Sequence, residues 1–171
     1  LGGPGGPVYL DDRLMAQPAA ALQLAAKEIL HLAFLVGEQL HLTTGMVRRK
    51  EEGQPAAGIE QRERLKGLGG KITEYLSGLF SAGVLREEQA AQTAGVMYLL
   101  GDVERMGELC VDVTLAIEDR DRRKTKYSKE AMKDLEKSLK VIEDMYGAAL
   151  QVLTTGDEES ARKIRKKKEK V

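Results

Sequence analysis

The sequence predicts an all-α protein built as an up-and-down helical bundle. Long stretches place apolar residues three and four positions apart, which is the spacing that lines one face of an α-helix. No stretch alternates apolar and polar residues for long enough to form a strand. Aromatic residues are scarce, with two Phe, five Tyr and no Trp, which argues against a β-sandwich and against stacking platforms for single-stranded nucleic acid. A length of 171 residues is sufficient for one domain with a sizeable core.

The first predicted helix follows a linker and lead-in of residues 1–17. The Gly- and Pro-rich run at residues 1–7 is typical of a flexible tether. Pro18 stands where a helix naturally begins, because its ring presets the helical φ angle. The helix is predicted from an apolar stripe and is broken by the Gly and Pro of residues 51–58. The stripe consists of Leu22, Ala25, Ile29, Leu32, Val36, Leu40, Thr43 and Val47.

Two further helices are predicted in the middle of the chain. The second runs from about Ile59 to Phe80 and is weakened by three glycines, which are poor helix formers. The third begins near Leu85 and continues to about Arg120, with a regular seam of the kind that packs helical bundles. The glycines are Gly67, Gly69 and Gly70, and the seam is Val96, Leu99, Val103, Met106, Cys110, Val113 and Ile117.

A fourth helix follows the charged stretch 119–126, and a fifth begins near the end of the chain. Gly156 is a stop signal for the fourth helix, and Asp157 is an N-cap signal for the fifth. The sequence Leu-Thr-Thr-Gly occurs at residues 42–45 and again at 153–156, which hints at an internal duplication. The apolar stripe of the fourth helix consists of Met132, Leu135, Leu139, Ile142, Tyr146, Ala149 and Leu153.

Charge and cysteine content restrict the classes of partner. Basic and acidic residues each number 27, so no overall positive field attracts nucleic acid, and we expect no nucleic-acid partner. The basic run at residues 162–168 is either the solvated face of a helix or a patch that faces phosphate or phospholipid. The single Cys110 excludes an internal disulfide and suits a reducing compartment.

The ends of the chain and its hydropathy indicate a soluble segment of a longer protein. Residues 1–7 lack the basic and then apolar pattern of a signal peptide. We find no uninterrupted apolar run of about 18 residues that would span a bilayer. The sequence starts at Leu1 and stops within a helical pattern at Val171, so we expect an excised fragment.

A row of carboxylates on the third predicted helix is the leading candidate for a site. Glu104, Glu108 and Asp112 follow one another at intervals of four residues, which places them on one helix face, roughly opposite the seam. Like charges at this spacing repel each other, and a bound cation would offset the repulsion. Hard divalent or trivalent metals prefer such oxygen ligands. The alternative is an acidic face that is simply solvated.

Two stretches resemble a known family. Residues 102–108, Asp-Val-Glu-Arg-Met-Gly-Glu, resemble the D-L-E-R-I-G-D signature of PhoU domains, whose E-x-x-x-D stripe binds surface metal clusters. Residues 9–14, Tyr-Leu-Asp-Asp-Arg-Leu, are followed by a Pro and an Ala- and Leu-rich helix. They are similar to the linker and first helix of the PhoU domain fused behind bacterial sodium/phosphate cotransporters.

The resemblance implies a domain layout and a ligand set. Residues 18–126 would form a complete three-helix repeat, and residues 127–171 the truncated start of a second repeat. The implied ligands of a metal ion such as iron, zinc or magnesium are Glu104, Glu108, Asp112 and, at lower rank, Asp102. The second predicted helix departs from the family, because it carries basic residues and glycines where acidic residues are usual.

The resemblance also implies a regulatory rather than an enzymatic role. The chain would act on the cytoplasmic side of the cell membrane, as part of an integral membrane protein that transports phosphate with sodium. Its partners would be the transporter domain of the same chain and regulatory proteins, and homo-oligomers remain open. The alternatives are a free-standing PhoU-like adaptor that regulates phosphate uptake and signalling, and a metal-dependent helical-bundle enzyme.

Two Glu-x-x-His pairs match the ligand motif of ferritin-like di-iron bundles. Glu28 precedes His31, and Glu38 precedes His41, by three residues. Di-iron chemistry needs the two copies on different helices, with both projecting into the bundle core. Both pairs lie on the first predicted helix, and His31 is expected to point away from its apolar stripe. We therefore interpret them as surface histidines.

Overall fold

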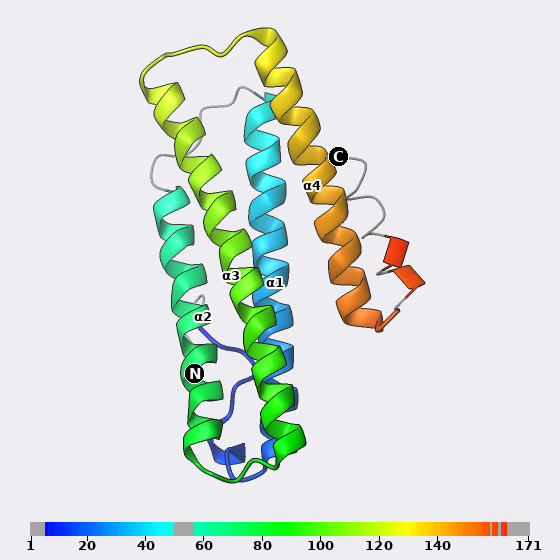
Figure 1. Ribbon diagram of the computed structural model, residues 1–171. Helices are drawn as coiled ribbons and strands as arrows, with labels where there is room; N and C mark the ends of the chain where they lie inside the picture. The colour runs from blue at the N-terminus through cyan, green and yellow to red at the C-terminus, as the bar shows by residue number, and fades with distance from the viewer. Residues whose placement is uncertain (1–5, 50–56, 158, 161, 164–171) are drawn as a thin grey trace.

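The computed structural model describes residues 6–49, 57–157, 159–160 and 162–163 (Figure 1). Within these residues the chain forms helices and no strand. The all-α, up-and-down bundle predicted from the sequence is therefore confirmed. Its elements are a short 3₁₀ helix η1 (Asp12–Leu14) and the helices α1 (Pro18–Arg49), α2 (Ala57–Ser81), α3 (Glu87–Arg122) and α4 (Lys129–Thr155).

The ends of the helices follow local signals in the sequence. α1 begins at Pro18, as predicted. The hydroxyl of Ser128 caps α4 by accepting a hydrogen bond from the N–H of Ala131. Gly156 ends α4 in the left-handed conformation, with φ of 71°, where a side chain would be strained. Asp157 accepts hydrogen bonds from the N–H groups that follow it, so the predicted fifth-helix cap forms, although most of residues 158–171 lie outside the described part.

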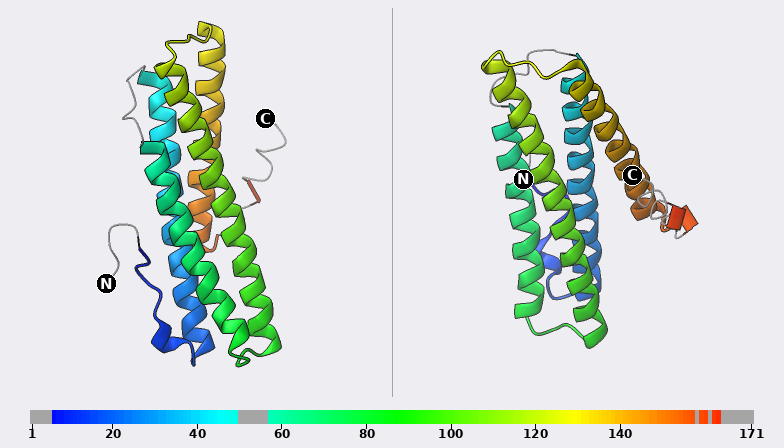
Figure 2. Two further views of the ribbon diagram at one scale, coloured as in Figure 1. Left: turned by 90° about the vertical axis from the view of Figure 1, so that its left-hand side faces the viewer. Right: turned by 45° about the horizontal axis from the view of Figure 1, so that its top comes forward.

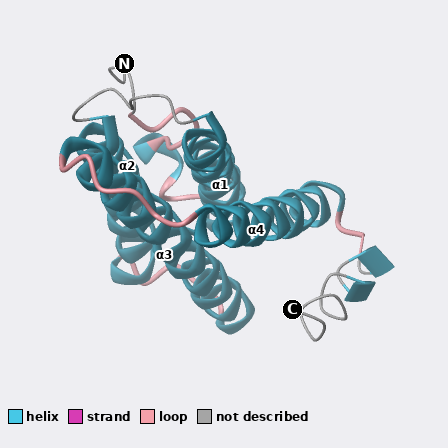
Figure 3. Cartoon of the chain, turned by 90° about the horizontal axis from the view of Figure 1, so that it is seen from above, coloured by secondary structure: helices cyan, strands magenta, loops and turns pink. Residues whose placement is uncertain are grey.

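α1 is the central helix of the bundle. It packs against α2, α3 and α4, whereas α4 packs chiefly on α1. Figure 2 shows α4 starting beside the end of α1 and diverging toward its own C-terminal end. Seen from above, α1, α2 and α3 form a compact group, and α4 leads away from it (Figure 3). The bundle is therefore a tight three-helix unit with a fourth helix attached at one side.

Two clusters of buried apolar side chains hold this arrangement. The larger cluster fills the three-helix unit, and a smaller one lies where α1, α3 and α4 meet. The larger cluster includes Ile29, Leu32 and Val36 of α1, Leu68, Ile72, Leu76 and Leu79 of α2, and Leu100, Val103 and Val111 of α3. The smaller one is centred on Val47, Ile117 and Leu139.

A buried polar cluster joins α1 to α3 between these two regions. Gln39 Nε2 donates a hydrogen bond to Thr114 Oγ1 at 3.0 Å. The hydroxyls of Thr43 and Thr114 lie 2.7 Å apart, and all three side chains are buried. Because each group has a partner, the cluster avoids the cost of burying an unsatisfied polar atom and determines how α1 faces α3.

α1 is more apolar than we expected from the absence of an uninterrupted apolar run. Its stretch Pro18–Val47 contains an 18-residue window that is long and apolar enough, by length and composition alone, to cross a membrane. Half of that window is buried inside the bundle. Three helices pack around α1, so it needs apolar side chains on most of its sides.

Candidate functional site between α2 and α3

A groove of about 630 Å³ lies between α2 and α3 and is lined by all three carboxylates of the predicted row. Its α2 wall carries the basic residues Arg62 and Lys66, and its α3 wall carries the three carboxylates. The floor is apolar. The carboxylates are Glu104, Glu108 and Asp112, and the floor is formed by Leu32, Val36, Leu65, Val111 and the glycine Gly107. The groove therefore has opposite charges on its two walls.

The carboxylate row lies at the edge of the buried face of α3. Glu108 and Asp112 are exposed, as predicted, whereas Glu104 is half-buried because the buried face is turned toward it. The fully buried residues of α3 include Leu100, Gly107 and Val111, which the predicted seam did not contain. Leu99 and Met106 of that seam are only half-buried. α3 packs against both α1 and α2, so its buried face is turned toward Gly107, and the neighbouring carboxylates come to line the contact with α2.

Gly69 of α2 makes room for the carboxyl group of Glu104. A Cβ atom on Gly69 would lie 2.9 Å from Cδ and 3.1 Å from Cγ of Glu104, closer than side chains normally approach. The Glu104 side chain thus rests on the backbone of α2. Burial, and then the negative charge of Glu108, raise the pKa of Glu104 above its usual value.

Asp112 forms an ion pair with Arg62 across the groove. The side chains of Arg62 and Asp112 are 40% and 62% exposed, so the pair contributes little to stability. Arg62 is one of the basic residues that α2 carries where the resemblance to PhoU domains led us to expect acidic ones. Asp112 therefore already has a cationic partner, and a metal ion would compete with Arg62 for it.

Asp102 lies apart from the other predicted ligands. It lines a small cleft of about 140 Å³ between α3 and α4, together with Val103 and Tyr146. That cleft is otherwise apolar, and Asp102 itself is exposed. Of the four predicted ligands, only Glu104, Glu108 and Asp112 share the groove.

Within the described residues, the groove does not offer the ligands of a closed metal cluster. Across the described part of the chain, no group of three or more His, Cys, Asp or Glu side chains is placed to hold a metal ion together. Structural zinc sites require four protein ligands, usually Cys or His, which the groove lacks. Magnesium keeps several waters and needs only one or two carboxylates. Glu104 and Glu108 supply such a pair.

Glu28 is a buried carboxylate that holds the residues preceding α1, a role that we did not predict. Its side chain is fully buried, and its carboxylate accepts hydrogen bonds from the backbone N–H groups of Val8, Tyr9 and Leu10. His31 Nδ1 lies 2.8 Å from the other carboxylate oxygen. His31 is half-buried and paired with Glu28, whereas we expected a surface histidine. The signal available in the sequence was the spacing of Glu28 from Ala21, Ala25 and Leu32, which places it on the buried stripe.

The second Glu-x-x-His pair has a different environment. Glu38 is exposed, and His41 Nδ1 lies 2.6 Å from a carboxylate oxygen of Glu143 on α4. His41 is largely exposed, as expected of a surface histidine. His31 and His41 thus contact different carboxylates, Glu28 and Glu143, and the two Glu-x-x-His pairs do not form one site.

Cys110 is buried in the contact face of α3, as predicted. Burial raises the pKa of its thiol to about 11, so the sulfur is protonated at neutral pH. Nearby, burial also raises the pKa of Tyr146, whose hydroxyl donates a hydrogen bond to the carbonyl of Ala33 at 2.9 Å. Both groups contribute to packing between α1, α3 and α4.

Comparisons of the chain with family models, with curated proteins and with solved structures find no match. The resemblance to PhoU domains stays a prediction that depends on residues 9–14 and 102–108.

Proposed function

We propose that this chain is a PhoU-like regulatory domain that acts at the cytoplasmic face of a membrane on sodium-dependent phosphate transport, with a divalent cation held by Glu104 and Glu108. The observation that carries the cation site is the position of Glu104, whose carboxyl group is half-buried against α2 and next to a second carboxylate. The transport role is carried by the resemblance of residues 9–14 and 102–108 to PhoU domains of phosphate cotransporters.

The electrostatics of the groove favour a cation. Ionised Glu104 suffers both loss of hydration and repulsion from Glu108, and these two effects raise its pKa. A bound divalent ion would offset both effects at once. Because Glu104 rests on the α2 backbone, the ion would also strengthen the contact between α2 and α3. Cation binding would in this way be linked to the rigidity of the three-helix unit.

We propose a binding role rather than a catalytic one for this groove. Its polar side chains, Arg62, Lys66 and the three carboxylates, provide charge but no activated nucleophile. The thiol of Cys110 lies in the packed core and is protonated at neutral pH. The groove is thus suited to sensing an ion, with the rest of the bundle surface available to the transporter domain or to a regulatory protein.

A titration of magnesium or manganese into the purified chain tests the cation site. We expect heat of binding in calorimetry and a rise in Tm, because an ion that binds only the folded state stabilises it. Both effects should be lost in Glu104→Gln/Glu108→Gln. The matched control is Glu130→Gln/Asp134→Asn, which removes an exposed pair of carboxylates at the same spacing on α4. Equal binding by the wild type and the Glu104/Glu108 variant would contradict the site.

Uptake measurements in cells test the transport role separately. Deleting the gene segment that encodes this domain should change sodium-dependent phosphate uptake or its response to phosphate supply. The Glu104→Gln/Glu108→Gln substitution in the intact gene should reproduce the effect if the cation is the signal. If deletion changes uptake but the substitution does not, the regulatory role stands and the proposal that the cation is its signal fails. Unchanged uptake in both cases would contradict the proposed function.

A further inference from the structure

The lead-in to α1 is folded onto the bundle. Residues 8–15, here called the strap, run along the α1 and α2 side of the molecule to the end where α1 begins (Figure 1). We had expected a linker and lead-in over residues 1–17; of these, residues 6–17 are described. Side chains of Leu10 and Met15 pack against the main apolar cluster. The strap therefore covers part of the surface that α1 and α2 present.

Glu28 is the first fastening of the strap. Its Oε2 atom accepts hydrogen bonds from three consecutive N–H groups, at 2.8 Å from Val8 and 3.2 Å from Leu10, with Tyr9 between them. Its Oε1 atom lies 2.8 Å from His31 Nδ1. The ring of Tyr9 stands edge-on to the ring of His31, with centroids 6.2 Å apart. One buried carboxylate thus holds the start of the strap to α1.

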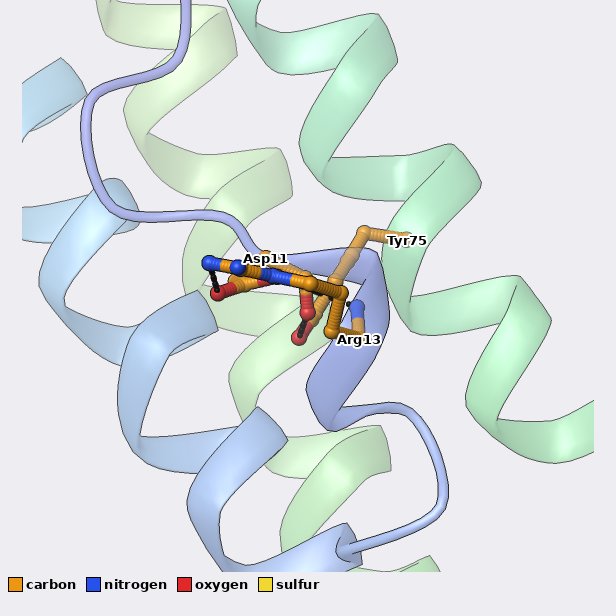
Figure 4. Close-up of polar contacts among 3 residues, drawn as sticks. All are labelled: Asp11, Arg13 and Tyr75. Atoms are coloured by element: carbon orange, nitrogen blue, oxygen red, sulfur yellow. Dashed lines mark hydrogen bonds and ion pairs between the residues drawn. The ribbon is translucent and has the colours of Figure 1, made fainter.

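Tyr75 of α2 is the second fastening. Its hydroxyl donates a hydrogen bond to the backbone carbonyl of Asp11 at 3.0 Å (Figure 4). The carboxylate of Asp11 pairs locally with Arg13 at 2.7 Å, which stabilises the turn at η1. Met15 then lies over Gly78, where a Cβ atom would approach Met15 Cε to 2.6 Å. The glycine allows the strap to lie close to α2.

The outer side of the strap is exposed to solvent. η1 has no buried residue, Val8 is 64% exposed and the Arg13 side chain is 89% exposed. If the strap opened, water would replace it as the hydrogen-bond partner of the Glu28 carboxylate and of the three N–H groups. Its attachment consists of a few polar contacts and the packing of Leu10 and Met15, which is less apolar burial than a packed helix has, so the strap should open at lower free energy than the helices.

We propose that the strap has two states, latched and released, and that the carboxylate of Glu28 is the latch. In the latched state residues 8–10 are fixed along α1. In the released state residues 8–10 are detached from α1, and the surface of α1 and α2 beneath Leu10 and Met15 is exposed. The strap is a conformational device that does not depend on the cation site or on phosphate transport.

Amide hydrogen exchange of the full chain, followed by NMR, tests the two states directly. In the wild type, the amides of Val8, Tyr9 and Leu10 should be protected, yet exchange faster than core amides of α1. Glu28→Gln should accelerate exchange at these three amides about tenfold without changing core amides, because a neutral oxygen accepts a weaker hydrogen bond than a carboxylate. The matched control is Glu38→Gln, which removes an exposed carboxylate from the same helix.

A second variant covers the case in which Glu28→Gln does not fold. Tyr75→Phe removes the hydrogen bond to Asp11 and keeps the ring, and it should accelerate tryptic cleavage after Arg13 several-fold, about as expected for one lost hydrogen bond. Strap amides that exchange at the same rate as core amides would overturn the proposal, since the strap would then open only with global unfolding. Unchanged exchange in Glu28→Gln, or unchanged cleavage in Tyr75→Phe, would also overturn it.

Discussion

Replacing Gly69 by Ala tests the position of Glu104 in the groove. Ala in the interior of a helix is normally more favourable than Gly by about 0.5–1 kcal/mol, because it restricts the unfolded chain and forms helix more readily. Gly67 of the same helix should show this gain in full, since a Cβ atom there meets nothing within 4 Å. Gly67→Ala is therefore the matched control.

At Gly69 the same gain is opposed by a collision. The new Cβ atom would stand 2.9 Å from Cδ and 3.1 Å from Cγ of Glu104, so the carboxyl group must move. An off-rotamer side chain costs about 0.5–1.5 kcal/mol, although a flexible Glu can also swing toward solvent. We therefore expect Gly69→Ala to stabilise the protein by roughly 0.5 kcal/mol less than Gly67→Ala, or to be neutral.

Urea denaturation with linear extrapolation measures the difference, and thermal unfolding should show it as about 1–2 °C in Tm. Combining Gly69→Ala with Glu104→Ala should restore the helix-forming gain, because the opposing carboxyl group is then absent. Equal stabilisation by Gly69→Ala and Gly67→Ala in a protein that keeps Glu104 would show that the Glu104 carboxyl group is not held against α2, and the electrostatic argument for the cation site would then fail.

Two other predictions concern the core and the pH dependence of stability. Thr114→Val should lower the free energy of unfolding by about 1–3 kcal/mol, because Gln39 and Thr43 lose a buried partner. Thr93→Val should cost less, since the Thr93 hydroxyl bonds a carbonyl of its own helix; equal losses in urea denaturation would contradict the role of the cluster. Glu104 has a raised pKa in the folded state, so the folded protein binds its proton more tightly than the unfolded chain does. Glu104→Gln should therefore match the wild type near pH 4 and be more stable than it near pH 8; a constant difference would argue against burial of the carboxylate.

The extent of the helices could be predicted from the sequence because the signals for it are local. Pro18 and Gly156, which were recognised as start and stop signals, act on the backbone within one or two turns, whatever surrounds them. The periodic apolar stripe of α1 likewise indicates the extent and the buried face of that one helix. Even α2, with its glycines, runs continuously from Ala57 to Ser81, because its apolar residues are anchored in the core.

The orientation of the candidate site could be predicted only in part. Spacing correctly places Glu104, Glu108 and Asp112 on one face of α3. It does not reveal that α3 packs against two helices, and it gives no weight to Gly107, whose missing side chain allows Val36 and Leu65 to approach. The buried face of α3 is therefore turned from the predicted seam, and the carboxylates face α2.

The class of fold, the approximate extent of the helices and the alignment of three carboxylates on one of them were readable from the amino-acid sequence. The positions of Glu104 over Gly69, of Asp112 beside Arg62 and of Glu28 under the strap became known from the packed molecule. Periodicity and capping act within a single helix, whereas each of these contacts joins residues from separate segments whose approach depends on how all the helices pack.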